Sequence, residues 1–132
     1  MKKGILTSLL LVLGISISSF GFIHPVLSTK SAVNRDLVIT NLMSGVNSGN
    51  QGLRMSSTYF LGELKSDEAV IPLMRMLKSD KNEEARIMAA LSLSKIADSR
   101  GIFAVKQAIK YDDSERVKKM CSNFYHDYLS KE

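Results

Sequence analysis

The fold is decided by two consecutive segments of equal length, LRMSSTYFLGELKSDEAVIPLMRMLKSDKNEE (residues 53–84) and ARIMAALSLSKIADSRGIFAVKQAIKYDDSER (residues 85–116). Laid over each other without a gap, they place apolar residues on apolar residues, for example Leu73 on Val105. An ungapped internal period of this length is typical of stacked helix pairs. The sequence therefore predicts an all-α fold, a short α-solenoid of helical hairpins with about six helices after the N-terminal segment.

The boundaries of the expected helices repeat with the same period. Three pairs of residues occupy equal places in successive units: Ser48 with Gln51, Asp80 with Glu83, and Asp112 with Glu115. Each pair has the spacing of a capping box, in which the N-cap residue and the third helical residue satisfy orphan backbone N–H groups. We therefore expect the first helix of each unit to take Ser48, Asp80 or Asp112 as its N-cap.

The repeats divide the chain into a targeting segment and one domain. The expected parts are a signal peptide (residues 1–28) and a repeat domain (residues 29–132), which holds a half unit (31–52), two full units (53–84 and 85–116) and a capping helix (117–132). A chain of this length is enough for one domain. The half unit lacks a first helix, and we expect its single helix to cover the apolar flank of the first full unit.

The N-terminal segment has the features of an export signal. Lys2 and Lys3 form a positive region, and an apolar stretch follows at residues 5–17. Small or tolerated residues allow cleavage after Ser28, or alternatively after Gly21. We therefore expect an exported protein, periplasmic or secreted.

An uncleaved membrane anchor is the alternative interpretation of the same segment. Residues 5–23 carry no charge and are just long enough to span a bilayer. Ser and Gly dilute this run and Pro25 interrupts it, which favours cleavage. In the alternative, residues 5–23 would hold the protein in the inner membrane.

Composition argues against several classes of site. Of the 18 basic residues two lie in the leader, and the other 16 against 13 acidic residues leave a net charge of only +3. That balance does not by itself indicate a nucleic-acid-binding protein. One cysteine, Cys121, and two histidines provide no zinc or redox spacing, so no metal and no cofactor is expected. Cys121 falls on the inward position of Ala89, which predicts a buried, inert thiol.

Periodicity assigns a core face to each helix of the first full unit. For the first helix, the expected apolar side comprises Leu53, Phe60, Leu61 and Leu64. For the second helix, the expected core stripe comprises Ala69, Val70, Leu73 and Leu77. The stripe lies within about 100° on a helical wheel, as a surface helix of a globular domain requires.

Residues 86–105 (RIMAALSLSKIADSRGIFAV) and 54–73 (RMSSTYFLGELKSDEAVIPL) carry a family pattern. They resemble the HEAT-like repeat first named from phycobilin lyases, with its arginine, small residues, Leu-Gly, turn and Ala-Val. Ser94 and Phe103 depart from that pattern, where the family has Gly and Pro. The resemblance implies that second helices line a concave face on which partners bind. It covers most of the chain after the leader and is specific for fold rather than function.

Opposite the buried stripe, the second helices are expected to present one binding strip. Its residues are Ile71, Arg75, Lys78, Phe103, Lys106, Gln107 and Lys110. The strip is largely basic with two apolar points, which indicates docking of an acidic partner through the exposed aromatic Phe103. The alternative is an ordinary solvated face. Arg54 and Arg86 are expected to pair with the helix-starting aspartates or to hold the turns between units.

We interpret the chain as an exported protein–protein interaction scaffold with no catalysis of its own and no catalytic residues. The expected partner is another protein of acidic character, not nucleic acid, and self-association through the stack ends is a further possibility. A membrane becomes relevant only if the N-terminal segment stays uncleaved. The alternative function is a lyase or DNA-glycosylase-like enzyme, or an enzyme subunit, which shares this repeat. Export and the absence of an aromatic and carboxylate pocket argue against that alternative.

Overall fold

The computed structural model describes residues 34–131 and contains only helices in that range. The elements are α1 (Arg35–Val46), α2 (Gln51–Glu63), the 3₁₀ turn η1 (Asp67–Ala69), α3 (Val70–Ser79), α4 (Glu83–Ile96), α5 (Ser99–Tyr111) and α6 (Glu115–Leu129). The predicted all-α architecture with six helices is confirmed. The expected signal peptide at residues 1–28 lies outside the described residues. Within them, no helix has the length and apolarity that a membrane span needs.

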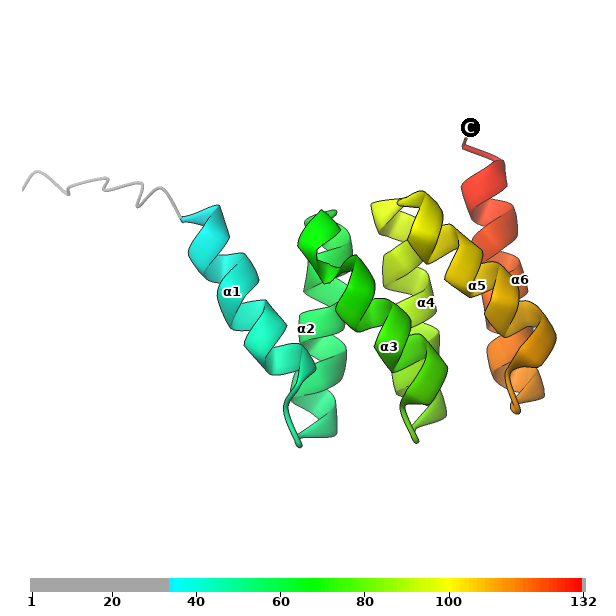
Figure 1. Ribbon diagram of the computed structural model, residues 1–132, viewed down its shortest axis with the longest axis horizontal. Helices are drawn as coiled ribbons and strands as arrows, with labels where there is room; N and C mark the ends of the chain where they lie inside the picture. Colours follow the sequence, from blue (N-terminus) through cyan, green and yellow to red (C-terminus); the bar gives the residue numbers. More distant parts are fainter. Residues whose placement is uncertain (1–33, 132) are drawn as a thin grey trace, which may run out of the picture. The chain divides into compact units, whose positions relative to one another are not determined.

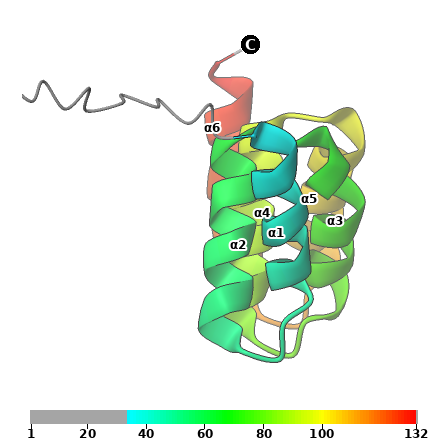
Figure 2. The same cartoon turned by 90° about the vertical axis from the view of Figure 1, so that its left-hand side faces the viewer.

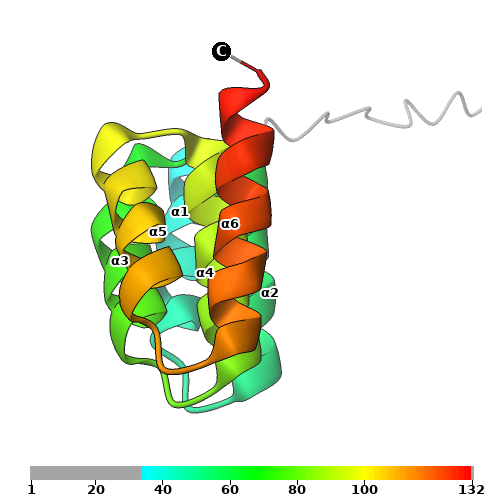
Figure 3. The same ribbon diagram turned by 90° about the vertical axis from the view of Figure 1, so that its right-hand side faces the viewer.

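The helices form two layers. Helices α2, α4 and α6 pack in sequence in one layer, and α3 packs beside α5 in the other (Figure 1). Helix α1 packs against α2 at the N-terminal end of this stack, which Figure 2 views from that end. Figure 3 shows the opposite end, where α6 packs against α5 and α4. The solenoid therefore consists of first-type helices (α2, α4, α6) and second-type helices (α1, α3, α5).

Residues one period apart fill the same place in successive layers of the core. Leu73 of α3 and Val105 of α5 are both completely buried, as the repeat predicts. Leu61 and Leu93 of the first-type helices are buried in the same way. Full burial of a leucine side chain stabilises the fold by about 1.5–3 kcal/mol. The repeated core positions are thus the main source of stability, and the expected stripe of the second-type helices is confirmed.

The expected apolar side of α2 is wrong at two positions. Leu53 and Phe60 are each 52% exposed, although Leu61 on the same helix is buried. Their counterparts in α4, Ala85 and Ser92, are fully buried. Those positions face the preceding first-type helix, and among residues 34–131 α2 has no such helix before it. The repeat period therefore predicts which positions are equivalent. It does not predict that a position loses its burial at the end of the stack of residues 34–131, where the neighbouring helix is missing.

The N-caps lie two residues later than predicted. Asn50 caps α2 by accepting a hydrogen bond from the Leu53 N–H (3.0 Å), and Asn82 caps α4 by accepting one from Ala85 (3.0 Å). Ser114 caps α6 in the same manner. The residues expected as N-caps instead accept a hydrogen bond from the N–H of the true cap. These pairs are Ser48 with Asn50, Asp80 with Asn82, and Asp112 with Ser114. Gln51, Glu83 and Glu115 consequently begin their helices and do not complete capping boxes.

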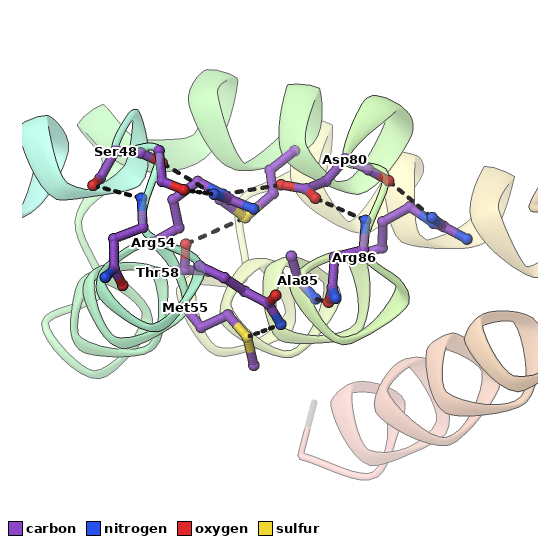
Figure 4. Close-up of polar contacts among 12 residues, drawn as sticks. Ser48, Arg54, Met55, Thr58, Asp80, Ala85 and Arg86 are labelled. Carbon is purple, nitrogen blue, oxygen red and sulfur yellow. Dashed lines mark hydrogen bonds and ion pairs between the residues drawn. The ribbon is translucent and has the colours of Figure 1, made fainter.

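A row of arginines links successive units, as the sequence predicts. The Arg54 Nε donates to Asp80 at 3.2 Å, and Arg86 donates twice to Asp112 at 2.9 and 3.0 Å. Arg86 also donates to the Asp80 carbonyl, so that Asp80 lies between the two arginines (Figure 4). Asp112, largely buried, raises the pKa of the Arg86 guanidinium above its ordinary value through this hydrogen bonding. The role of these arginines is therefore structural.

We expect the substitution Gly62→Ala to destabilise the domain by about 1 kcal/mol or more. A Cβ at this position would lie 2.7 Å from Ser92 Cβ and 2.8 Å from its Cα, so α2 and α4 would have to separate. Overpacking costs about 1–3 kcal/mol, and a clash with backbone belongs in the upper part of that range, so the cost exceeds the gain of about 1 kcal/mol in helix propensity by about 1 kcal/mol or more. Thermal unfolding followed by circular dichroism measures the change.

Gly52→Ala is the matched control on the same helix. Its added Cβ would meet only Asn50 Oδ1, at 3.4 Å, so the gain in helix propensity should prevail. The melting temperature of this variant should rise slightly while that of Gly62→Ala falls. A Gly62→Ala protein that melts at or above the wild-type temperature would contradict the close approach of α2 and α4.

A candidate protein-binding groove between α3 and α5

The exposed sides of α3 and α5 lie next to each other on the layer of second-type helices (Figure 1). On α3 the positions opposite the buried Leu73 are Ile71, Arg75 and Lys78, and all three are exposed. On α5 the position opposite Val105 is Phe103, which is 60% exposed. The two helices thus place equivalent residues of successive units on one surface.

A groove of about 700 Å³ runs between these helices. Its lining residues are Met74, Arg75, Leu77, Lys78, Ser79, Phe103, Ala104, Gln107, Ala108, Tyr111 and Asp112. Small side chains on α5, Ala104 and Ala108, allow the depression, and two aromatic side chains, Phe103 and Tyr111, stand beside it. We call this feature the α3–α5 groove. An apolar floor with a few charged groups at the edge is typical of a recognition surface.

The α3–α5 groove brings together four residues of the strip predicted from the sequence. These are Arg75, Lys78, Phe103 and Gln107. Ile71, Lys106 and Lys110 do not line the groove, although all three are exposed. Lys106 instead lies over the ring of Tyr125 in α6, with its Nζ 5.4 Å from the ring centroid. A binding role for the seven residues of the strip stays a prediction.

The other seven lining residues were not part of the predicted strip, and Met74 and Tyr111 are the largest of those with exposed surface. Tyr111 is 73% exposed and is the last residue of α5. It follows Phe103 and Gln107 at intervals of four, which places all three on one side of the helix. That spacing was visible in the sequence. Alignment of the two units did not reveal this row of residues, because Tyr111 aligns with Ser79 in the preceding unit.

The groove is electropositive because its cations are unpaired and its carboxylate is neutralised. Neither Arg75 nor Lys78 forms a hydrogen bond or ion pair with another residue of the described part of the chain. Asp112, the acidic residue of the lining, accepts hydrogen bonds from the Nε and Nη2 of Arg86. The groove therefore offers positive charge to a ligand.

Charges on the first-type helices are arranged differently. Lys95 of α4 pairs with Glu63 of α2, and Arg116 of α6 pairs with Glu84 of α4. The hydrogen bond from Lys95 lowers the pKa of the Glu63 carboxyl. Each pair joins two residues one period apart in neighbouring units. Within each pair the two opposite charges neutralise each other on the surface. Lys95 and Arg116 are thus neutralised between units, whereas Arg75 and Lys78 of the groove have no such partner among residues 34–131.

The other candidate chemical groups in residues 34–131 are Cys121 and the neighbours His126 and Asp127. Cys121 is completely buried, as predicted, and burial raises the pKa of its thiol to about 12. No cluster of three or more metal-ligating side chains occurs in this range. His126 and Asp127 are adjacent and exposed on α6, where neighbouring residues do not face each other.

We expect Cys121 to resist alkylation in the folded protein. Its ordinary pKa is about 8.5, so at pH 8.5 half of the unfolded chains carry a thiolate, whereas the folded chain keeps the thiol protonated. Because the folded pKa is raised, the contribution to stability is complete below about pH 8.5 and decreases as the pH rises toward 12. Iodoacetamide at pH 8.5 should modify the protein only in denaturant. Rapid modification without denaturant would contradict the burial.

Comparison with known families agrees with this architecture. A family model described as HEAT repeats matches residues 39–121, more than half of the chain. No curated protein matches the chain with significant similarity. HEAT repeats generally serve as protein-interaction scaffolds, which use the surfaces that stacked repeats present. The geometry of the paired helices and the matched segment together show that this chain belongs to the HEAT repeat family.

Proposed function

We propose that this protein is an exported binding module whose α3–α5 groove holds a segment of another protein. The observation that carries the proposal is the juxtaposition of unpaired cations with exposed aromatic side chains. Arg75 and Lys78 stand on one side of the groove, and Phe103 and Tyr111 belong to the other helix. Aromatic residues and arginine are the usual anchors of protein interfaces.

We infer from the groove chemistry that the partner is a segment with both acidic and apolar residues. A carboxylate can accept two hydrogen bonds from the Arg75 guanidinium and pair with Lys78. Apolar side chains can pack on Met74, Ala104 and Phe103 between the helices. A partner rich in Lys or Arg would be repelled by the same cations.

The size of the groove indicates a transient complex. Stable interfaces bury about 800 Å² on each partner. The two short helices that form the groove, α3 and α5, provide less than that to a single bound segment. We therefore expect weak binding that depends on ionic strength, because exposed charge pairs are screened by salt.

We propose no catalysis by this chain, in preference to a lyase or glycosylase activity. The carboxylate in the groove, Asp112, is held by Arg86 and is not available as an acid or base. The buried Cys121 thiol is protonated at neutral pH and is not available as a nucleophile. These features support binding rather than chemistry.

We also propose that the protein acts outside the cytoplasm, in the periplasm or secreted. The support is the sequence of residues 1–28, with Lys2, Lys3 and the following apolar run. Cell fractionation with intact-mass measurement tests this proposal. A mature protein that lacks the first 28 or 21 residues is expected, whereas full-length protein in the cytoplasm would refute export. Full-length protein in the membrane fraction would indicate an anchor at residues 5–23.

Selection from a displayed library of random peptides tests the binding proposal. The wild-type protein should enrich peptides that combine Asp or Glu with Leu, Met or Phe. Enrichment should decline in high salt. Selection of basic peptides, or of peptides without charge, would refute the assigned partner chemistry.

A further inference from the structure

The two ends of the helix stack differ in the side chains they present. In a solenoid each first-type helix packs one side on the preceding helix and the other side on the following one. The hydrogen bond from Ser92 Oγ to the Thr58 carbonyl (2.9 Å) shows that position 92 faces backward, toward α2. The close approach of Gly62 to Ser92 shows the same. Positions 60 and 53, one period earlier than 92 and 85, therefore face backward from α2.

These backward-facing positions are apolar and exposed at the N-terminal end. Phe60 and Leu53 are each 52% exposed, and Leu37 of α1 is 60% exposed. The Arg35 guanidinium donates to the Leu64 carbonyl at 2.7 Å, which places the start of α1 beside the end of α2. Figure 2 views the two helices from this end. We call Leu37, Leu53, Ser56 and Phe60 the N-terminal end face.

The opposite end of the stack is more polar, although Leu129, which is 46% exposed, lies on the same side of α6 as Ser122 and His126. The forward-facing positions of α2 are those of Thr58 and Gly62, which contact α4. Two periods later the same positions on α6 carry Ser122 and His126, with the exposed Asn123 beside them. Figure 3 shows α6 at this end. A polar outer face is what terminal repeats need for solubility, so α6 is a better cap for the stack than α2.

The charge pattern of the N-terminal end face fits a second copy of this chain. Between Asp36 and Glu63 the sequence contains a single charged residue, Arg54. Arg54 is held by Asp80 and by the carbonyls of Ser48 and Gly49. A surface that meets its own copy across a two-fold axis must avoid like charges, and an uncharged apolar surface meets that condition. Arg35, whose guanidinium donates to the Leu64 carbonyl, is the cation at the edge of this face, and the area between Leu53 and Phe60 offers none to an acidic partner.

From this asymmetry we infer that two copies associate through their N-terminal end faces about a two-fold axis. Helix α2 of one copy packs against α2 of the other, and the axis passes near Ser56, between Leu53 and Phe60. Head-to-tail stacking would place these apolar side chains on the polar face of α6, so it is disfavoured. The pairing of identical ends also closes the assembly at two copies and prevents filaments.

The dimer is expected to dissociate on dilution. Helices of 12 and 13 residues are about 18 and 20 Å long, so the pair offers a face of about 400 Å². This is about half of what a standard interface buries on each partner. The α3–α5 groove is formed by other helices and remains accessible in each copy. The inference thus goes beyond the proposed function by making the binding module bivalent, which raises its avidity for a partner with two segments.

Disulfide trapping in the full-length protein tests this inference. The native Cys121 is buried, so an introduced surface cysteine is the thiol that forms any intermolecular disulfide. Under mild oxidation Ser56→Cys should give at least tenfold more covalent dimer than the control Asn123→Cys, which places an exposed cysteine on α6. Adding Phe60→Glu to Ser56→Cys should reduce the dimer at least tenfold. Phe60 is exposed, so circular dichroism should show that this variant stays folded.

Three results would overturn the two-fold dimer. The first is no more dimer from Ser56→Cys than from Asn123→Cys, as expected if another segment or another protein covers the face. The second is a dimer that persists with Phe60→Glu, which would place the association elsewhere in the chain. The third is mixed disulfides between a Ser56→Cys chain and an Asn123→Cys chain, which would indicate head-to-tail stacking.

Discussion

Replacement of Leu73 by aspartate should unfold the domain. Leu73 is completely buried in α3, at the position that Val105 occupies one layer later. The substitution loses the leucine contacts, worth about 2–5 kcal/mol, and also buries a carboxylate without a partner. A domain of this size has a total stability of about 5–15 kcal/mol, so little or none would be left. Circular dichroism should show loss of helix or a melting temperature near or below ambient.

Ile71→Asp is the matched control for this variant. Ile71 lies two residues earlier on the same helix, and its side chain is 49% exposed. The same chemical change there should alter the free energy of unfolding by no more than about 0.5 kcal/mol. A wild-type melting curve for Leu73→Asp would contradict the assigned core face of α3. Equal destabilisation of both variants would contradict it as well.

Reversal of both groove cations, Arg75→Glu with Lys78→Glu, should abolish binding of the selected acidic peptides. Both side chains line the α3–α5 groove and lack a partner among the described residues, so the fold should not change. Like charges brought together at an interface cost several kcal/mol, which corresponds to a loss of affinity of at least about a hundredfold. Fluorescence anisotropy with a labelled peptide at fixed ionic strength measures the loss.

A second double variant with the same net charge distinguishes binding in the groove from attraction by the overall charge of the protein. Lys119 and Lys131 are exposed on and after α6, outside the lining of the groove. Lys119→Glu with Lys131→Glu should weaken peptide binding by no more than a few-fold, through long-range electrostatics alone. If the two double variants bind equally weakly, the peptide senses net charge and does not occupy the groove.

The repeat period predicted the parts of the fold that depend on equivalence between units. Leu73 and Val105 share a buried place, and Arg54 and Arg86 link consecutive units, because each layer presents the same surroundings to its counterpart. An internal period is a strong signal because the same pattern of buried and exposed positions occurs in the sequence more than once. The fold class followed directly from that signal.

Burial at the end of the stack could not be predicted by the same comparison. Leu53 and Phe60 occupy the positions of the buried Ala85 and Ser92, yet they are exposed. Equivalence holds only while a neighbouring helix stands on both sides, and α2 has a first-type neighbour on one side within residues 34–131. The sequence shows the position of a residue within its unit, whereas the neighbouring unit decides its exposure.

The N-caps were missed because two suitable residues stand two positions apart at each helix start. Asp80 and Asn82 both accept hydrogen bonds from backbone N–H groups, and only the geometry shows that Asn82 is the cap of α4. Asp80 is instead positioned between Arg54 and Arg86. A tertiary contact that joins two units thus determined which polar residue caps the helix.

The candidate site was predicted in part. The helical wheel placed Arg75, Lys78, Phe103 and Gln107 on one surface, and all four line the groove. Lys106, also part of the predicted strip, does not line the groove, because its long side chain reaches the Tyr125 ring of α6, a contact between separate helices. Such contacts depend on how helices pack, which the pattern along one helix does not contain.

Site-specific photo-cross-linking in the native cells tests whether the α3–α5 groove is the partner-binding surface. A benzophenone amino acid replaces Phe103 in one variant and Lys119, on α6, in a matched control. We expect a defined protein adduct from position 103 that is absent from position 119, attached through a segment rich in acidic and apolar residues. No adduct from position 103, or the same adducts from both positions, would contradict it.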